Sequence, residues 1–266
     1  MKKKIGMYDS GVGGLSVVGA VLEEIKDAGI IYLADNVHVP YGEKSFDEVA
    51  NFSLGICDFL VKKDVGIIVI ACNMSSAISL EILRKKYKDI IILGMIEFGA
   101  KAAVISSENF PIGVLATEGT VKSKAYTKFI HSLKPNSLVI EEACPEFVLL
   151  VENCKIHTKE AEETVKKHLE PIVKNNCKTV ILGCTHYPFL KDIIKKVAPD
   201  LEIIDPALLL AKHLKEKFLE NISENREMLC FATGSSSQFK KTGSILFSGK
   251  NIKKVEKATW IENYLK

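Results

Sequence analysis

The sequence lacks three features that would assign a protein to a class at once: a strong charge bias, a long apolar run and a disulfide pattern. Its 266 residues carry 36 lysines and arginines against 33 aspartates and glutamates, so a net charge of +3 gives no reason to expect nucleic acid as a partner. No apolar run approaches the roughly 18 residues of a membrane span. The apolar stretch after Lys4 stops at Asp9, short of the about 7–15 residues of a signal peptide. We therefore expect a cytoplasmic protein with no membrane segment.

The 7 cysteines are odd in number, are spread along the chain and form no CxxC pair. This pattern favours reduced thiols over a disulfide framework. A closed zinc site needs a full set of ligands at recognisable spacing, and Cys184 with His186 supplies a single pair. We therefore expect no metal.

Short apolar runs alternate with helix-like segments along the chain. The run 65–73 is apolar without alternation, which is typical of a strand buried on both faces of a parallel sheet. The same reading predicts further strands within 5–14, 30–36, 90–96, 112–121, 137–143, 179–187 and 201–207. Helices are expected at 45–63, 75–88, 123–132 and 159–175. This alternation predicts an α/β fold with mainly parallel sheets covered by helices.

The two halves of the chain carry the same pattern. Ile5 aligns with Ile112 at the start of each half, and Cys72 aligns with Cys184 just past a buried strand. We expect two similar α/β domains related by a pseudo-two-fold axis, formed by residues 1–95 plus 207–266 and by residues 96–206. Residues 207–266 are expected to be mostly helical, with Trp260 packing the last helix.

Cys72 and Cys184 carry the sharpest chemical signal, because ligands of open α/β sheets bind at the carboxyl ends of the strands. Two matched thiols facing each other across a cleft could act as base and acid on opposite faces of one carbon, which would invert a stereocentre. A free thiol has a pKa of about 8.5 and needs a helper to act near neutral pH. Asp9 and His186 lie at the corresponding strand ends. The remaining cysteines are expected to be mostly buried filler.

Other interpretations of these residues stay open. Cys184 with His186 could form the nucleophile of a thiol hydrolase, which would leave Cys72 without a role. The chain could also be a carboxylate-binding protein without catalysis, since a fold does not decide a function. In the loop 9–14, Ser10 and the backbone amides could hold a carboxylate at a helix N-terminus. The dinucleotide pattern fails there because Ser16 replaces its third glycine.

The motifs, taken in order, resemble those of the bacterial glutamate racemase family over nearly the whole chain. They are DSGVGGLSV (9–17), ADNVHVPYG (34–42), IACN (70–73), ATEGTVKSKAY (116–126), ACPEFVLLVE (143–152), GCTHYP (183–188) and ATGSSSQF (232–239). The resemblance implies two α/β domains around a cleft and a cofactor-independent interconversion of L- and D-glutamate. It also implies a homodimer, and a supply of D-glutamate for peptidoglycan synthesis.

The same resemblance implies roles for individual residues. Cys72 and Cys184 would be the paired acid–base thiols, assisted by Asp9 and His186 respectively, and Glu152 would take part in proton handling. The residues that would bind the substrate are Asp9, Ser10, Tyr41, Gly42, Asn73, Met74, Thr117, Thr185 and His186.

This sequence departs from the family pattern at Met74, where the family usually has threonine. A methionine side chain cannot donate a hydrogen bond, and the loss of one bond to a charged group costs about 1.5–3 kcal/mol. Ser75 or Ser76 could compensate. The departure raises aspartate or another acidic amino acid as an alternative substrate. Phe98, where the family often has proline, lies outside the expected catalytic set.

Overall fold

A computed structural model describes residues 2–247, 252 and 254–266 and confirms the α/β fold. The larger sheet has the strand order β10-β9-β2-β1-β3-β4, and every neighbouring pair in it is parallel. Its strands are β1 (Lys4–Asp9), β2 (Ile30–Ala34), β3 (Val65–Ile70), β4 (Ile91–Gly94), β9 (Met228–Ala232) and β10 (Val255–Lys257).

The smaller sheet is also parallel, with the order β6-β5-β7-β8. Its strands are β5 (Ile112–Ala116), β6 (Val139–Ala143), β7 (Thr179–Gly183) and β8 (Glu202–Ile204). This order repeats the β2-β1-β3-β4 part of the larger sheet, so β3 and β7 occupy corresponding places. The structure thus agrees with the repeat that aligned Cys72 with Cys184.

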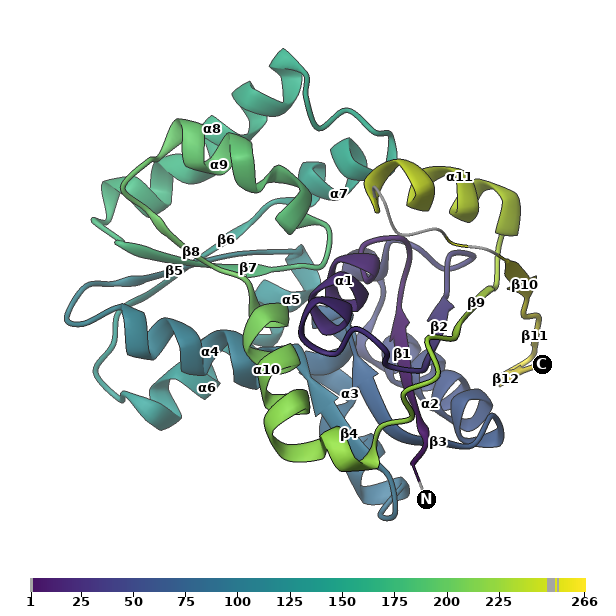
Figure 1. The fold of residues 1–266 in the computed structure, drawn as a ribbon. Helices are drawn as coiled ribbons and strands as arrows, with labels where there is room; N and C mark the ends of the chain where they lie inside the picture. Colours follow the sequence, from purple (N-terminus) through teal and green to yellow (C-terminus); the bar gives the residue numbers. More distant parts are fainter. Residues whose placement is uncertain (1, 248–251, 253) are drawn as a thin grey trace.

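Helices cover both faces of each sheet, as a parallel sheet requires. In Figure 1, α8 and α9 lie on one face of the smaller sheet, and α4 and α6 lie on the other. The helices are α1 (Leu15–Glu24), α2 (Phe46–Lys62), α3 (Asn73–Lys86), α4 (Met95–Ser106), α5 (Glu118–Ser123), α6 (Ala125–Leu133), α7 (Pro145–Glu152), α8 (Lys159–Lys174), α9 (Lys191–Val197), α10 (Pro206–Phe218) and α11 (Ser236–Leu246). Short 3₁₀ turns are η1 (Tyr41–Glu43), η2 (Tyr187–Leu190) and η3 (Leu219–Asn221).

The sequence of α8 shows why these segments are helical. The Thr158 side chain accepts a hydrogen bond from the backbone N–H of Ala161 and so caps the first turn. Ala161, Val165 and Leu169 follow at four-residue spacing and are buried in the core of the smaller sheet.

Among the described residues, no helix combines the length and the apolar composition that a membrane span needs.

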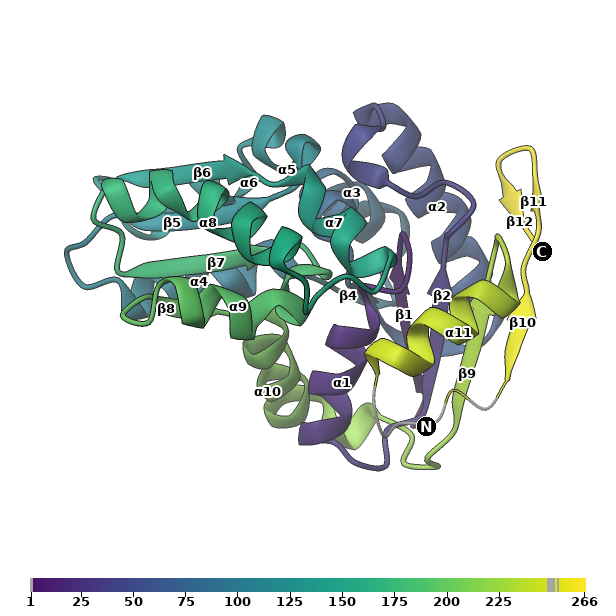
Figure 2. The same ribbon diagram turned by 90° about the horizontal axis from the view of Figure 1, so that it is seen from above.

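The chain passes between the two sheets twice. Helix α4 leads from β4 in the larger sheet to β5 in the smaller one, and α10 leads from β8 back toward β9. The two connecting helices pack against each other, and α10 also packs against α1 (Figures 1 and 2). This helix pair therefore joins the two halves on one side of the molecule.

The expectation that residues 207–266 are mostly helical is wrong. Besides α10 and α11, this segment supplies β9 and β10 to the larger sheet and ends in a hairpin of β11 (Trp260–Ile261) and β12 (Tyr264–Leu265). Trp260 packs against α2. Its indole N–H donates to Asp35 at 2.7 Å, and its ring lies 5.9 Å from that of Phe52. The position of Trp260 thus depends on the buried carboxylate of Asp35, which is distant in the sequence.

All seven cysteines are free thiols, and several are held in apolar surroundings. Cys230 lies in β9 within the core of the larger sheet, where burial raises its pKa from 9.0 to about 12. Between these values the unfolded chain releases a proton that the folded chain keeps, so this thiol's contribution to stability is complete below pH 9 and falls as the pH rises toward 12.

We therefore expect Cys230 to lower the free energy of unfolding by about 2 kcal/mol between roughly pH 8 and pH 10.5. Urea unfolding of the wild type and of Cys230→Ala at both pH values isolates this contribution from other titrating groups. The stability difference between the two proteins should shrink by that amount at the higher pH. A difference that does not change with pH would contradict the prediction.

Candidate active site

One cavity brings together residues from both sheets. It comprises about 350 Å³ of space, part of which is open to solvent, and both Cys72 and Cys184 lie in its wall. The complete lining is Ser10, Val39, Pro40, Tyr41, Gly42, Cys72, Asn73, Met74, Thr117, Thr120, Val148, Gly183, Cys184, Thr185 and His186.

The two thiols reach the cavity from corresponding strands. Cys72 follows β3 and is the N-cap residue of α3, whereas Cys184 directly follows β7. Their side chains are almost fully buried, at 6% and 7% exposure. A small molecule in this cavity is therefore enclosed with one thiol from each sheet.

Asp9, the last residue of β1, lies fully buried behind the cavity wall. Its carboxylate accepts hydrogen bonds from the Thr185 hydroxyl and the Gly11 backbone N–H, both at 3.1 Å. Burial raises the pKa of Asp9, although the nearby His186 and these hydrogen bonds act in the opposite direction. Asp9 is thus a carboxyl group that can hold or release a proton inside the protein.

His186 connects Cys184 to Glu152. Its Nδ1 lies 3.7 Å from the Cys184 Sγ, and its Nε2 lies 2.8 Å from a Glu152 carboxylate oxygen. Burial lowers the pKa of His186, but the hydrogen bonds to Cys184 and Glu152 outweigh burial and raise it well above the usual value. A protonated imidazole is therefore favoured beside Cys184.

The surroundings of Cys72 favour its protonated form. Burial and the negative charge of Asp9 raise the pKa of Cys72 to about 12. At neutral pH Cys72 is therefore a thiol that can donate a proton. The cavity holds one sulfur beside a cation and one sulfur beside a carboxyl group, which is the arrangement of a base and an acid.

The structure places most of the predicted site residues on the cavity wall. Asp9 and Glu152 are the exceptions, because each lies behind the wall and contacts a lining residue instead. The Tyr41 hydroxyl donates to Asp35 at 2.5 Å, and the Asn73 side-chain oxygen accepts from Tyr126 at 2.7 Å. The predicted lining residues are Ser10, Tyr41, Gly42, Cys72, Asn73, Met74, Thr117, Cys184, Thr185 and His186.

Sequence reasoning missed several residues at the site. Thr120 lines the cavity, and its hydroxyl lies 3.0 Å from that of Thr117. A threonine three residues after Thr117 at the start of a helix shares its face, and this spacing could have found it. Asp35 is fully buried and contacts four side chains, those of Tyr41, His38, Thr233 and Trp260. No sequence motif around Asp35 predicts that it holds Tyr41 at the site. The other missed lining residues are Val39, Pro40, Val148 and Gly183.

Met74 contributes an apolar surface to a cavity that is otherwise rich in hydroxyls. Its side chain is buried and lies against Gly119, where a Cβ atom would come within 2.7 Å of the methionine methyl group. Ser75 and Ser76 are also buried, but neither lines the cavity. That one of them compensates for the missing hydroxyl stays a prediction.

The lining contains no lysine or arginine, and His186 is its one basic side chain. Across the described part of the chain, no three His, Cys, Asp or Glu side chains gather in a way that could hold a metal ion. Helices α1, α3 and α5 begin beside the cavity, after Gly14, Cys72 and Thr117. Unpaired backbone N–H groups at helix N-termini attract anions such as carboxylates.

A second, outer pocket of about 640 Å³ adjoins the cavity. The two share Pro40, Gly42, Thr117 and Val148, and the outer pocket adds Glu43, Glu118, Pro145 and Leu149. It therefore lies between η1 and α5 on one side and α7 on the other. Its lining includes the exposed residues Glu43, Glu118 and Leu149.

Known proteins resemble this chain in sequence and in fold. A model of the Asp/Glu/Hydantoin racemase family matches residues 13–214. A glutamate racemase of Carboxydothermus hydrogenoformans is 40% identical over 256 residues, which are 95% of each protein. Crystal structures of glutamate racemases from Bacillus anthracis and from Francisella tularensis, the latter with D-glutamate, have TM-scores of 0.90 at 33% and 31% identity and cover at least 98% of both chains. The chain therefore belongs to the Asp/Glu/Hydantoin racemase family, as its ordered motifs predicted.

Proposed function

We propose that this protein is a glutamate racemase that uses Cys72 and Cys184 as its two acid–base groups and needs no cofactor. The observation that carries the proposal is the pair of buried thiols from corresponding strands, which line one cavity in unlike electrostatic surroundings. The similarity to glutamate racemases over almost the whole chain supports glutamate as the substrate.

The surroundings of the thiols assign the proton transfers. The Cys184 thiolate, beside the His186 cation, takes the α-proton from one face of the substrate carbon. The Cys72 thiol delivers its own proton to the opposite face, which inverts the stereocentre. The sulfurs then hold the reverse protonation pattern, which suits the other enantiomer. Asp9 and the His186–Glu152 pair stabilise the two patterns in turn.

The remaining rate enhancement would come from the way the cavity positions the substrate and from the polar groups in its wall. General acid–base catalysis alone typically gives ~10²–10⁴-fold, so the carbanionic transition state needs further stabilisation. Hydroxyl groups and helix N-termini around a water-poor cavity would hold the substrate carboxylates without a charged side chain. The candidate substrate-binding groups are Ser10, Tyr41, Gly42, Asn73, Met74, Thr117, Thr120 and Thr185.

Proton NMR in D₂O tests the function directly. Purified protein without any cofactor is incubated with L-glutamate, then with D-glutamate and with both enantiomers of aspartate. We expect loss of the α-proton signal of glutamate together with formation of the opposite enantiomer. Exchange with aspartate alone would identify a different substrate. Binding of glutamate without any exchange would instead indicate a carboxylate-binding protein on this scaffold.

Met74→Thr is expected to lower the KM for glutamate by about tenfold or more, because a hydroxyl at this position can donate to a substrate carboxylate. Such a bond to a charged group contributes about 1.5–3 kcal/mol, and about 1.4 kcal/mol is a factor of ten. Met74→Leu conserves the volume without adding a donor and should leave KM unchanged. Equal KM values for all three proteins would show that residue 74 does not contact the substrate.

The family membership extends the proposal to the cell. D-Glutamate from this reaction would enter peptidoglycan synthesis. The thiol mechanism requires Cys72 and Cys184 to stay reduced, which supports a cytoplasmic site for the enzyme. We also propose that residues 1–95 plus 207–266 form one domain and residues 96–206 the other. A homodimer is expected from the family resemblance, and the mass in solution will test it.

A further inference from the structure

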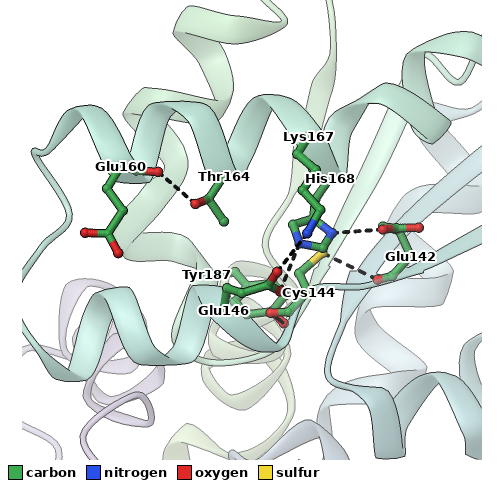
Figure 3. A network of polar contacts seen from close by, with 8 residues as sticks. All are labelled: Glu142, Cys144, Glu146, Glu160, Thr164, Lys167, His168 and Tyr187. Carbon is green, nitrogen blue, oxygen red and sulfur yellow. Dashed lines mark hydrogen bonds and ion pairs between the residues drawn. The ribbon is translucent and has the colours of Figure 1, made fainter.

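Behind α7 lies a cluster of charged side chains that the proton transfers do not use (Figure 3). His168, on α8, is 4% exposed and contacts a carboxylate with each ring nitrogen. Its Nδ1 lies 2.8 Å from Glu142, the residue before the end of β6, and its Nε2 lies 3.0 Å from Glu146 in the first turn of α7. Lys167 binds the other oxygen of Glu146 at 2.9 Å.

One imidazole ring joins three elements here. Its two nitrogens, on α8, each face a carboxylate oxygen, one of Glu142 on β6 and one of Glu146 on α7. Although partial burial acts in the opposite direction, contacts with Lys167 and His168 lower the pKa of Glu146. The cluster is thus a clamp of polar contacts between β6, α7 and α8.

The clamp is connected to the active site through α7. The Phe147 ring lies edge-on between His168, at 5.4 Å, and Tyr187, at 5.0 Å. The Tyr187 hydroxyl donates to the backbone carbonyl of Cys144, just before α7, at 2.8 Å. At its other end the short helix carries Glu152, whose carboxylate binds His186. One end of α7 is therefore held by the clamp, and the other end holds the partner of the catalytic histidine.

We propose that His168 is a positioning residue for racemisation: by binding Glu142 and Glu146 together, it fixes α7 so that Glu152 stays on His186 beside Cys184. This inference rests on the proposed function. It assigns a role to a histidine that lies outside the sequence motifs of the site. Loss of the clamp would let α7 shift and would weaken proton transfer at Cys184 while leaving Cys72 in place.

Primary isotope effects distinguish this selective damage from general loosening. When transfer at Cys184 becomes slower, removal of the α-proton limits the rate for the enantiomer that faces Cys184. The deuterium isotope effect on kcat/KM then rises for that enantiomer and falls for the other. Because the enantiomers have equal free energy, kcat/KM must remain equal in the two directions for every variant, which provides an internal check.

The experiment compares four variants with the wild type, using both enantiomers of glutamate with hydrogen or deuterium at the α-carbon. His168→Leu and Glu146→Ala remove the clamp. Glu146→Gln conserves it, because the glutamine amide can still form a hydrogen bond with the ring nitrogen of His168 that faces residue 146. Thr164→Val is the matched control, since Thr164 lies one turn earlier on α8 and donates only to the Glu160 carbonyl (Figure 3).

We expect His168→Leu and Glu146→Ala to lower kcat/KM by about tenfold or more, as a small misplacement of catalytic groups does, with opposite changes in the two isotope effects. Glu146→Gln and Thr164→Val should behave like the wild type. Unchanged rates, or a loss of rate with unchanged isotope effects, would overturn the proposal. If His168→Leu does not fold, the contrast between the alanine and glutamine variants of Glu146 decides. Absence of proton exchange by the wild type would contradict the proposed function instead.

Discussion

Replacing either Cys72 or Cys184 by serine is expected to abolish racemisation in both directions, with a loss of at least about 10³-fold in kcat. A serine hydroxyl is a far weaker acid than a thiol, so it neither supplies a base at Cys184 nor donates a proton readily at Cys72. Both sulfurs are needed in every turnover because each serves one face of the carbon. Chiral analysis of the glutamate formed from each pure enantiomer measures the loss.

The single variants should differ in proton exchange even though neither racemises. In D₂O, Cys72→Ser retains the base at Cys184, so we expect slow exchange of the α-proton without inversion for one enantiomer only. Cys154→Ser alters a cysteine that does not line the cavity and serves as the control. Full racemisation by Cys72→Ser would contradict the two-thiol mechanism. Covalent capture of substrate at Cys184 in that variant would indicate a thiol hydrolase.

Gly13→Ala is expected to lower kcat/KM by roughly 100-fold, although residue 13 does not line the cavity. A Cβ atom at this position would lie 2.5 Å from Nδ1 of His186 and 2.5 Å from the hydroxyl oxygen of Thr185. The side chain of His186 or of Thr185 must therefore move to make room for the new Cβ atom. Both side chains belong to the site, because His186 contacts Cys184 and Thr185 donates to Asp9. Steady-state kinetics with both enantiomers, together with a thermal unfolding midpoint, measure the effect.

Gly113→Ala is the matched control for Gly13→Ala. Its Cβ would lie 2.9 Å from a methyl group of Ile172, in the core of the smaller sheet, and neither residue lines the cavity. Overpacking of this kind typically costs about 1–3 kcal/mol of stability. We expect this variant to unfold at a lower temperature with kcat unchanged. An equal loss of kcat in the two variants would mean that Gly13 acts only through stability.

Periodicity predicted the parts of the fold that depend on local sequence. The unbroken apolar run before Cys72 forms β3, and its counterpart before Cys184 forms β7, because parallel strands buried on both faces admit no polar alternation. The same reasoning failed for β9 and β10. These short strands, three to five residues long, are stabilised by the sheet edge that they join rather than by a pattern of their own.

The candidate site likewise contains residues that the local sequence predicts and residues that it does not. Cys72 and Cys184 could be found from the repeat because their positions follow from strand ends. Glu152 and Asp35 could not be assigned from the residues themselves, because their partners lie far along the chain or in another element. The resemblance to a family supplied Glu152, but Asp35 and Thr120 emerged only when the fold brought their neighbours together.

The two crossings of the chain through α4 and α10 determine how the enclosed cavity can exchange its contents. Because these helices pack together on one side, we expect any separation of the two sheets to pivot about that pair, as about a hinge. The gap then widens most on the opposite side, where η1 and α7 border the outer pocket. Substrate and product would then enter and leave through the same opening. The rate of opening would set an upper limit on kcat, and substitutions of Cys72 or Cys184 could not raise that limit.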